Sequence, residues 1–149
     1  MKINNDGINL ILKFEGYSGK PYLCPAGIPT IGYGNTYYPD GTKVTMNDKR
    51  TNKVKAKEMF FLIVKKYEDA VNNKVTTTLT QNQFNALVSF CYNVGVHAFS
   101  LSTLLKKVNN DCYDITIIDE FLKWVKINKK VSQGLKNRRK EELALYFTP

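Results

Sequence analysis

The sequence predicts an α+β fold, in which a small antiparallel β-lobe is joined by one long helix to a larger helical lobe, with a cleft between them. Glycine, proline and strand-forming residues are concentrated in residues 17–44, whereas the rest of the chain has mainly helical patterning. The length of 149 residues is typical of one domain. We expect a single domain over 1–149, with a β-rich lobe at about 15–50, a connecting helix at about 52–72, and a helical lobe at about 75–149 that also contains 1–14.

The opening helix is predicted from four apolar residues at near-helical spacing: Ile8, Ile11, Leu12 and Phe14. Asn4, Asn5 or Asp6 can cap its start, because a short polar side chain can accept a hydrogen bond from the first turn. Gly16 supplies a C-terminal stop. We therefore expect Glu15 at the C-terminal end of this helix.

Residues 17–44 predict a small, tightly turned antiparallel sheet. This stretch contains five glycines and four prolines, which favour turns, and β-branched or aromatic residues such as Tyr22, Ile31 and Tyr33 lie between them. When short strands are separated by tight turns, each strand pairs with the next one along the chain. We therefore expect β-hairpins in this stretch.

The remainder of the chain is predicted to be helical. Thr51 is the expected cap of the long helix, whose apolar residues recur at three- and four-residue intervals. Thr80 and Gln83 have the spacing of a capping box, and Gly95 is expected to end the helix that they open. Three shorter helices are expected at about 102–108, 116–125 and 134–146.

The composition indicates a globular chain. The apolar fraction is 43% and the charged fraction is 23%, and no run of apolar residues approaches the length of a membrane span. The first residues have no apolar segment of the kind found in secretory signals, so we expect the chain to accumulate in the cytoplasm. The three cysteines, Cys24, Cys91 and Cys112, lack zinc-site spacing, and with His97 as the single histidine they predict free thiols, no metal site and no cofactor.

The net charge of +9 is unevenly distributed, because residues 121–140 contain eight Lys or Arg and no acidic residue. Such a block indicates an anionic partner. Nucleic acid, anionic lipid and the bacterial envelope all carry the required charge. No nucleic-acid readout motif accompanies the block, so we expect no nucleic-acid partner.

The most informative pattern begins at Glu15, continues with Cys24 after eight intervening residues, and reaches Thr30 after five more. This spacing resembles the phage lysozymes of glycoside hydrolase family 24, the T-even and lambdoid lysozymes, in which a Glu that ends the first helix is followed by Asp or Cys and then by Thr. Four later blocks resemble the family in the same order: 83–95, 99–105, 121–124 and 134–139.

The resemblance implies a lysozyme-like fold and an endolysin that lyses the cell wall for phage release. Its substrate would be the β-1,4 bond between N-acetylmuramic acid and N-acetylglucosamine in peptidoglycan. Glycoside hydrolysis needs a carboxylic acid to protonate the leaving oxygen, and Glu15 suits this role. Two alternatives remain: a lytic transglycosylase, which forms an anhydro sugar, and a cationic protein that disrupts membranes through its basic C-terminal helices.

Cys24 stands where many glycosidases carry a second carboxylate. A carboxylate at this position would orient water, which inverts the anomeric configuration, whereas a thiolate can attack the anomeric carbon directly, which retains it. The residues alone leave both routes open. The resemblance implies that Thr30 holds the catalytic water through its hydroxyl.

The resemblance also implies residues that line the saccharide groove, namely Thr36, Tyr92, Asn93 and Ser102. Arg138 or Arg139 is expected to form an ion pair with Glu15. As partners, the family implies peptidoglycan glycan strands and a holin that permeabilises the inner membrane. We expect a monomer that is stored in the host cytoplasm, acts on the periplasmic or cell-wall peptidoglycan after that step, and contacts the anionic envelope or outer membrane through its basic C-terminal helices.

Overall fold

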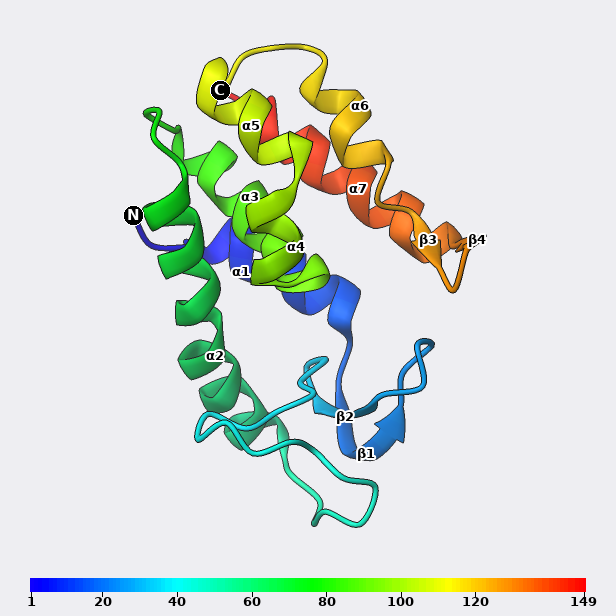
Figure 1. Cartoon of the computed structure of the whole chain (residues 1–149). Helices are drawn as coiled ribbons and strands as arrows, with labels where there is room; N and C mark the ends of the chain where they lie inside the picture. The colour runs from blue at the N-terminus through cyan, green and yellow to red at the C-terminus, as the bar shows by residue number, and fades with distance from the viewer. The chain divides into compact units, whose positions relative to one another are not determined.

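Seven helices and two short antiparallel hairpins make up the chain (Figure 1). The computed structural model describes residues 1–149, and they divide into two units. The β unit is Leu12–Lys66, and the helical unit is Met1–Ile11 together with Tyr67–Pro149. The boundaries fall inside α1 (Asn5–Glu15) and α2 (Lys53–Lys74). The helical majority and the small antiparallel sheets confirm the predicted fold class, while the single domain and the cleft stay predictions.

The start and end of α1 follow from local signals. The Asn4 side-chain oxygen accepts hydrogen bonds from the N–H groups of Asp6, at 3.1 Å, and Gly7, at 3.4 Å, so Asn4 is the cap among the three candidates. Gly16 has φ of 63° and its N–H donates to the Leu12 carbonyl at 3.1 Å. Glycine adopts this left-handed backbone at little cost, which ends the helix with Glu15 as its last residue.

The predicted antiparallel sheet is the hairpin of β1 (Ser18–Leu23) and β2 (Pro29–Gly32). Tyr22 pairs with Thr30, and the register shifts between Ser18 and Tyr22. Backbone bridges continue beyond the strands, between Ile31 and Asn35 and between Tyr37 and Lys43. The chain from 17 to 44 is therefore a series of tight reversals, as its glycine and proline content predicts.

The long helix begins one residue later than predicted. The Asn52 side-chain oxygen accepts a hydrogen bond from the Lys55 N–H at 2.9 Å, so Asn52 caps α2. Thr51, the predicted cap, is the residue before this cap, and its N–H donates to the Gly19 carbonyl of β1 at 2.7 Å. Ala56, Phe60 and Val64 form a buried face of α2 in the β unit.

The helical unit is built around α3 (Gln81–Val94), in which residues 83–92 are all buried. Thr80 and Gln83 form the predicted capping box, and Gly95 ends the helix with φ of 92°. α3 packs against α7 (Gln133–Tyr146), and Phe90 of α3 makes edge contacts with the rings of Phe121 and Trp124. The other helices are α4 (Val96–Leu101), which was not predicted, α5 (Thr103–Asn110) and α6 (Ile117–Leu122).

A second hairpin replaces the end of the helix predicted at about 116–125. α6 ends at Leu122, and β3 (Lys126–Ile127) then pairs with β4 (Lys130–Val131). Asn128 and Lys129 connect them with φ of 48° and 66°, the left-handed values of a type I′ turn. The predicted helix was too long here because the turn contains no glycine, the residue that would have indicated a reversal in the sequence. No helix in the chain combines the length and the apolar character needed to cross a bilayer.

Candidate active site

Glu15 is half-buried at the end of α1, and its carboxyl group lies against the backbone of Gly34. A Cβ atom placed on Gly34 would lie 2.0 Å from Glu15 Oε2 and 2.9 Å from Cδ. Real atoms do not approach so closely, so only glycine leaves room for the carboxyl group in this position. Gly34 also has φ of 74°, a backbone conformation that other residues adopt at a cost.

Cys24 and Thr30 lie on one face of the β1–β2 hairpin. Tyr22 and Thr30 are directly paired across the two strands, and paired side chains project to the same side of a sheet. Cys24 comes directly after β1, two residues beyond Tyr22, and its N–H bond to the Ile28 carbonyl continues the pairing, so the alternation of side chains puts it on the same face. The Thr30 side chain is buried, with 2% exposure, whereas Cys24 is half-buried.

The Ile28 carbonyl connects these two residues. It accepts a hydrogen bond from the Cys24 N–H at 3.0 Å and another from the Thr30 hydroxyl at 2.8 Å. The Thr30 hydroxyl has one proton to donate, and this bond uses it. Its oxygen therefore remains an acceptor for a donor such as water.

The Tyr22 phenol, which pairs with Thr30 across the hairpin, has a raised pKa. Burial raises the pKa of its phenol, and the charges of Glu15 and then Cys24 raise it further. The phenol therefore lies within electrostatic range of both groups. Glu15, Cys24 and Thr30 all belong to the β unit, and their catalytic roles stay predictions.

The profile of the Phage lysozyme family matches residues 12–142. The chain belongs to the phage lysozyme family. Among its relatives, the endolysin of Bacillus phage PZA is 42% identical over 98% of this chain, and the chain spans 55% of that protein's length. The endolysin of Salmonella phage P22 is 37% identical over 99% of both chains. An endolysin structure from Escherichia coli O157:H7 phage FAHEc1 superposes with a TM-score of 0.86 at 35% identity, covering 99% of this chain and 94% of that one.

The residues predicted to line a saccharide groove fall in both units of the chain. Thr36 is half-buried in the β unit, where its carbonyl accepts from the Val44 N–H at 3.0 Å. Tyr92 is largely buried and its ring packs 4.9 Å from that of Tyr67. Asn93 accepts a hydrogen bond from Arg139. Their contact with substrate stays a prediction.

Ser102 has a structural task in the helical unit. Its hydroxyl donates to the Phe99 carbonyl at 2.7 Å and accepts from the Leu105 N–H at 3.1 Å, so it caps α5. Only 5% of the side chain is exposed. The helix cap accounts for this serine, and its predicted contact with substrate stays untested.

Arg138 and Arg139 form a buried ionic cluster with Glu142. Arg138 Nε lies 3.1 Å from Glu142 Oε1, and Arg139 Nη1 lies 3.0 Å from Oε2. Ser89 also donates to Oε1, at 2.7 Å. Burial raises the pKa of the Glu142 carboxyl, and the two guanidinium charges oppose this effect. Both arginines thus have a partner on their own helix, and the ion pair predicted with Glu15 stays a prediction.

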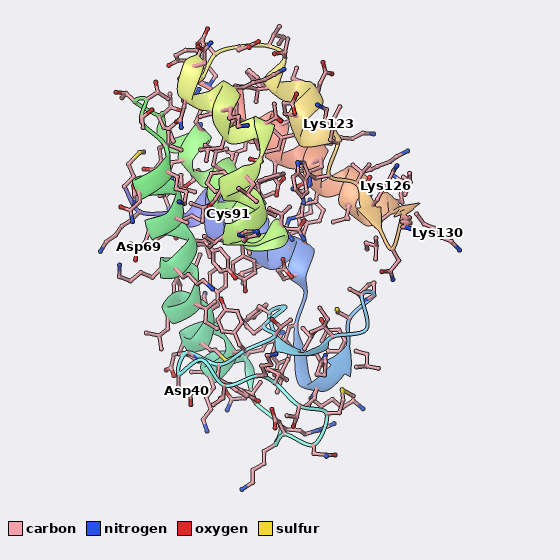
Figure 2. All side chains as sticks on the ribbon, viewed as in Figure 1. Asp40, Asp69, Cys91, Lys123, Lys126 and Lys130 are labelled. Carbon is pink, nitrogen blue, oxygen red and sulfur yellow. The ribbon has the colours of Figure 1, made fainter.

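The basic stretch forms an exposed surface on the helical unit, which we call the lysine surface. Figure 2 labels three of the lysines between α6 and β4. Lys123 lies 2.9 Å from Glu120, and this contact lowers the pKa of Glu120. Five further lysines are exposed and have no acidic partner: Lys126, Lys129, Lys130, Lys136 and Lys140.

Two residues of the site, Tyr22 and Gly34, were not assigned roles from the sequence. Tyr22 had a usable signal, because its position two residues before Cys24 on a predicted strand places both on one face. Gly34 lies in the motif from Thr30 onward, but its approach to Glu15 depends on how the end of α1 meets the turn after β2. The spacing of residues does not contain that information.

Proposed function

We propose that this phage lysozyme is a peptidoglycan hydrolase that cleaves the β-1,4 bond between N-acetylmuramic acid and N-acetylglucosamine. The observation that carries the proposal is the joint placement of Glu15, Cys24 and Thr30 in the β unit, with Tyr22 within electrostatic range of the first two. The proteins that it resembles are named endolysins, which supports a lytic role.

In this proposal, Glu15 is the general acid. Its proton passes to the glycosidic oxygen as the bond to the anomeric carbon breaks, so the leaving sugar departs as a neutral alcohol. The contact with Gly34 defines where the carboxyl group can lie. Proton transfer depends steeply on this placement, because the donor and the leaving oxygen must come within hydrogen-bonding distance.

Thr30 and Cys24 supply the second half of the reaction. Because the Thr30 oxygen can only accept, a water molecule would donate one proton to it and the other to the Cys24 thiolate, with its lone pair directed at the anomeric carbon. This route inverts the configuration and forms an α-anomer. Direct attack by sulfur would instead form a thioglycosyl intermediate, and its hydrolysis would give the β-anomer.

The reaction class is tested by digesting purified cell walls in heavy-oxygen water and measuring the products by mass spectrometry. A muramidase adds one water molecule, so each new reducing end is N-acetylmuramic acid with one heavy oxygen atom. A lytic transglycosylase gives an anhydro sugar that is lighter by one water and carries no label. Unlabelled anhydro products would contradict the proposed hydrolysis.

Cys24 is tested by a pair of substitutions. We expect Cys24→Asp to retain at least about a tenth of the activity, because a carboxylate can also activate water, and Cys24→Ala to lose about 100-fold or more, in line with typical contributions of general bases. Wall clearing measures the rates, circular dichroism checks the fold, and proton NMR of the first product gives the anomer. An active Cys24→Ala enzyme would show that the thiol only packs.

The cellular setting that we propose follows from the family and the charge distribution. The enzyme would be stored as a monomer in the host cytoplasm and reach the wall after a holin permeabilises the inner membrane. The lysine surface supports an electrostatic contact with the anionic envelope, since five exposed lysines without acidic partners attract polyanions over about a Debye length. No nucleic-acid partner is part of the proposal.

A further inference from the structure

The loop between β1 and β2 places Ile28 opposite Cys24. Leu23 pairs with Pro29 in this hairpin, so the next pair in the same register is Cys24 with Ile28. The Cys24 N–H donates to the Ile28 carbonyl at 3.0 Å, and the Gly27 N–H donates to the Cys24 carbonyl at 2.8 Å. Gly27 has φ of 77°, the left-handed conformation that closes a three-residue hairpin loop. The loop therefore determines which residue lies beside the thiol.

Two large apolar side chains at this end of the hairpin are exposed, and they project to opposite faces. Ile28 is 48% exposed and Leu23 is 57% exposed. Ile28 shares the face of Cys24 and Thr30, because residues opposite each other in a sheet project to the same side. Leu23 precedes Cys24 by one residue, so the alternation of side chains puts it on the other face. Of the two, only Ile28 presents apolar surface beside the proposed catalytic groups.

The geometry of a β-linked sugar gives this side chain a partner. The leaving oxygen is equatorial, and an attacking group reaches the anomeric carbon from the opposite face of the ring. That face carries the axial hydrogen atoms of C1, C3 and C5 and no axial hydroxyl, so it is apolar. In the proposed reaction Cys24 acts from this side, whether it activates water or attacks directly. A side chain beside the thiol therefore meets C–H groups, which an aliphatic residue can cover without burying an unpaired polar group.

We propose that Ile28 is a substrate-binding residue, whose side chain packs against the C–H face of the N-acetylmuramic acid unit that is attacked. The inference rests on the proposed function, since that function places Cys24 on the attacking side of the anomeric carbon. Removal of the two apolar surfaces from water favours binding. The side chain forms no bond to the reacting atoms, so it contributes equally to the bound substrate and the transition state. Its effect is on KM and not on kcat.

The test is a graded pair of substitutions, Ile28→Val and Ile28→Thr, assayed on soluble glycan chains that alternate N-acetylglucosamine and N-acetylmuramic acid. Valine removes one carbon atom, and threonine replaces the longer branch with a hydroxyl. We expect KM to rise about threefold for valine and about tenfold for threonine, in line with the apolar contact that each loses. The kcat value should stay within about twofold. Both replacements are β-branched and suit a hairpin, so circular dichroism and the thermal midpoint should show an intact fold.

The control is Leu23→Thr, which changes an exposed apolar side chain on the opposite face of the same hairpin and should leave KM unaltered. NMR adds a measurement that a purely structural role would not move. In Glu15→Gln protein, which should bind the glycan without cleaving it, the Ile28 methyl groups should show nuclear Overhauser effects to the ring protons on C3 and C5 of N-acetylmuramic acid. The Leu23 methyl groups should show none.

Three results would overturn the proposal: an unaltered KM in both Ile28 variants, an equal rise of KM in Leu23→Thr, or a saturated complex without contacts between Ile28 and the sugar ring. Any of these results in an enzyme that still hydrolyses the glycan would refute this inference alone. Cleavage of the glycan by Glu15→Gln at the full rate would instead refute the proposed function, and this inference with it.

Discussion

Glu15→Gln is expected to reduce wall-clearing activity at least about 1,000-fold while the protein stays folded. Glutamine has nearly the same shape but no proton to transfer, and general acid catalysis typically contributes about 100- to 10,000-fold. The side chain is half-buried at the end of α1, where an amide can be accommodated. Turbidity clearing of purified walls measures the activity, and circular dichroism with a thermal midpoint checks the fold.

Glu58→Gln is the matched control, because Glu58 is an exposed acid on α2 in the same unit. Like Glu15→Gln, it removes one negative charge from the protein, and it should keep full activity. The Glu15→Gln variant also retains the lysine surface, so it separates the two classes of function. Undiminished wall clearing by Glu15→Gln would refute the glycosidase, whereas lost clearing with undiminished killing of intact cells would assign that killing to a membrane effect of the cationic surface.

Local signals explain why the position of Glu15 was predictable. Gly16 acts within one turn of Glu15, so its identity is enough to place the end of α1, whereas the start lay among Asn4, Asn5 and Asp6 until the hydrogen bonds of Asn4 identified the cap. The same holds for the capping box at Thr80 and Gln83. The β1–β2 hairpin was predictable from turn residues, although its register, which sets Tyr22 opposite Thr30, was not.

Two features could not be predicted from the sequence: the residue that caps α2, for which there were two candidates, and the second hairpin. At the start of α2, Asn52 and Thr51 are both good caps by residue type, and the structure uses Asn52 while the Thr51 N–H bonds to the Gly19 carbonyl. In the second hairpin, Asn128 and Lys129 adopt the left-handed backbone conformation of a tight turn. A glycine at either position would have indicated that turn in the sequence. Neither outcome can be read from periodicity, which is why the helix predicted to extend to 125 was too long.

Gly34→Ala is expected to lower activity about 100-fold without unfolding the protein. The added Cβ would meet Glu15 Oε2 at 2.0 Å, and this atom is the far end of a flexible side chain that can swing aside. The fold therefore survives, but the proton donor moves, and a displacement of about 1 Å in a catalytic group can cost about 100-fold in rate. Kinetics on purified walls and a thermal midpoint measure the two effects.

The positive φ of Gly34 also lowers the stability of the alanine variant. A substitution at a second glycine with positive φ measures this loss of stability separately. Alanine at a φ of 74° is strained by about 1 to 2 kcal/mol. Gly41 has φ of 89° and nothing within 4 Å of its Cβ position, so Gly41→Ala should lose similar stability and keep its activity. A large loss of activity in Gly34→Ala alone would locate the effect at the Glu15 carboxyl. Equal activity in the two variants would mean that catalysis does not depend on the carboxyl resting against Gly34.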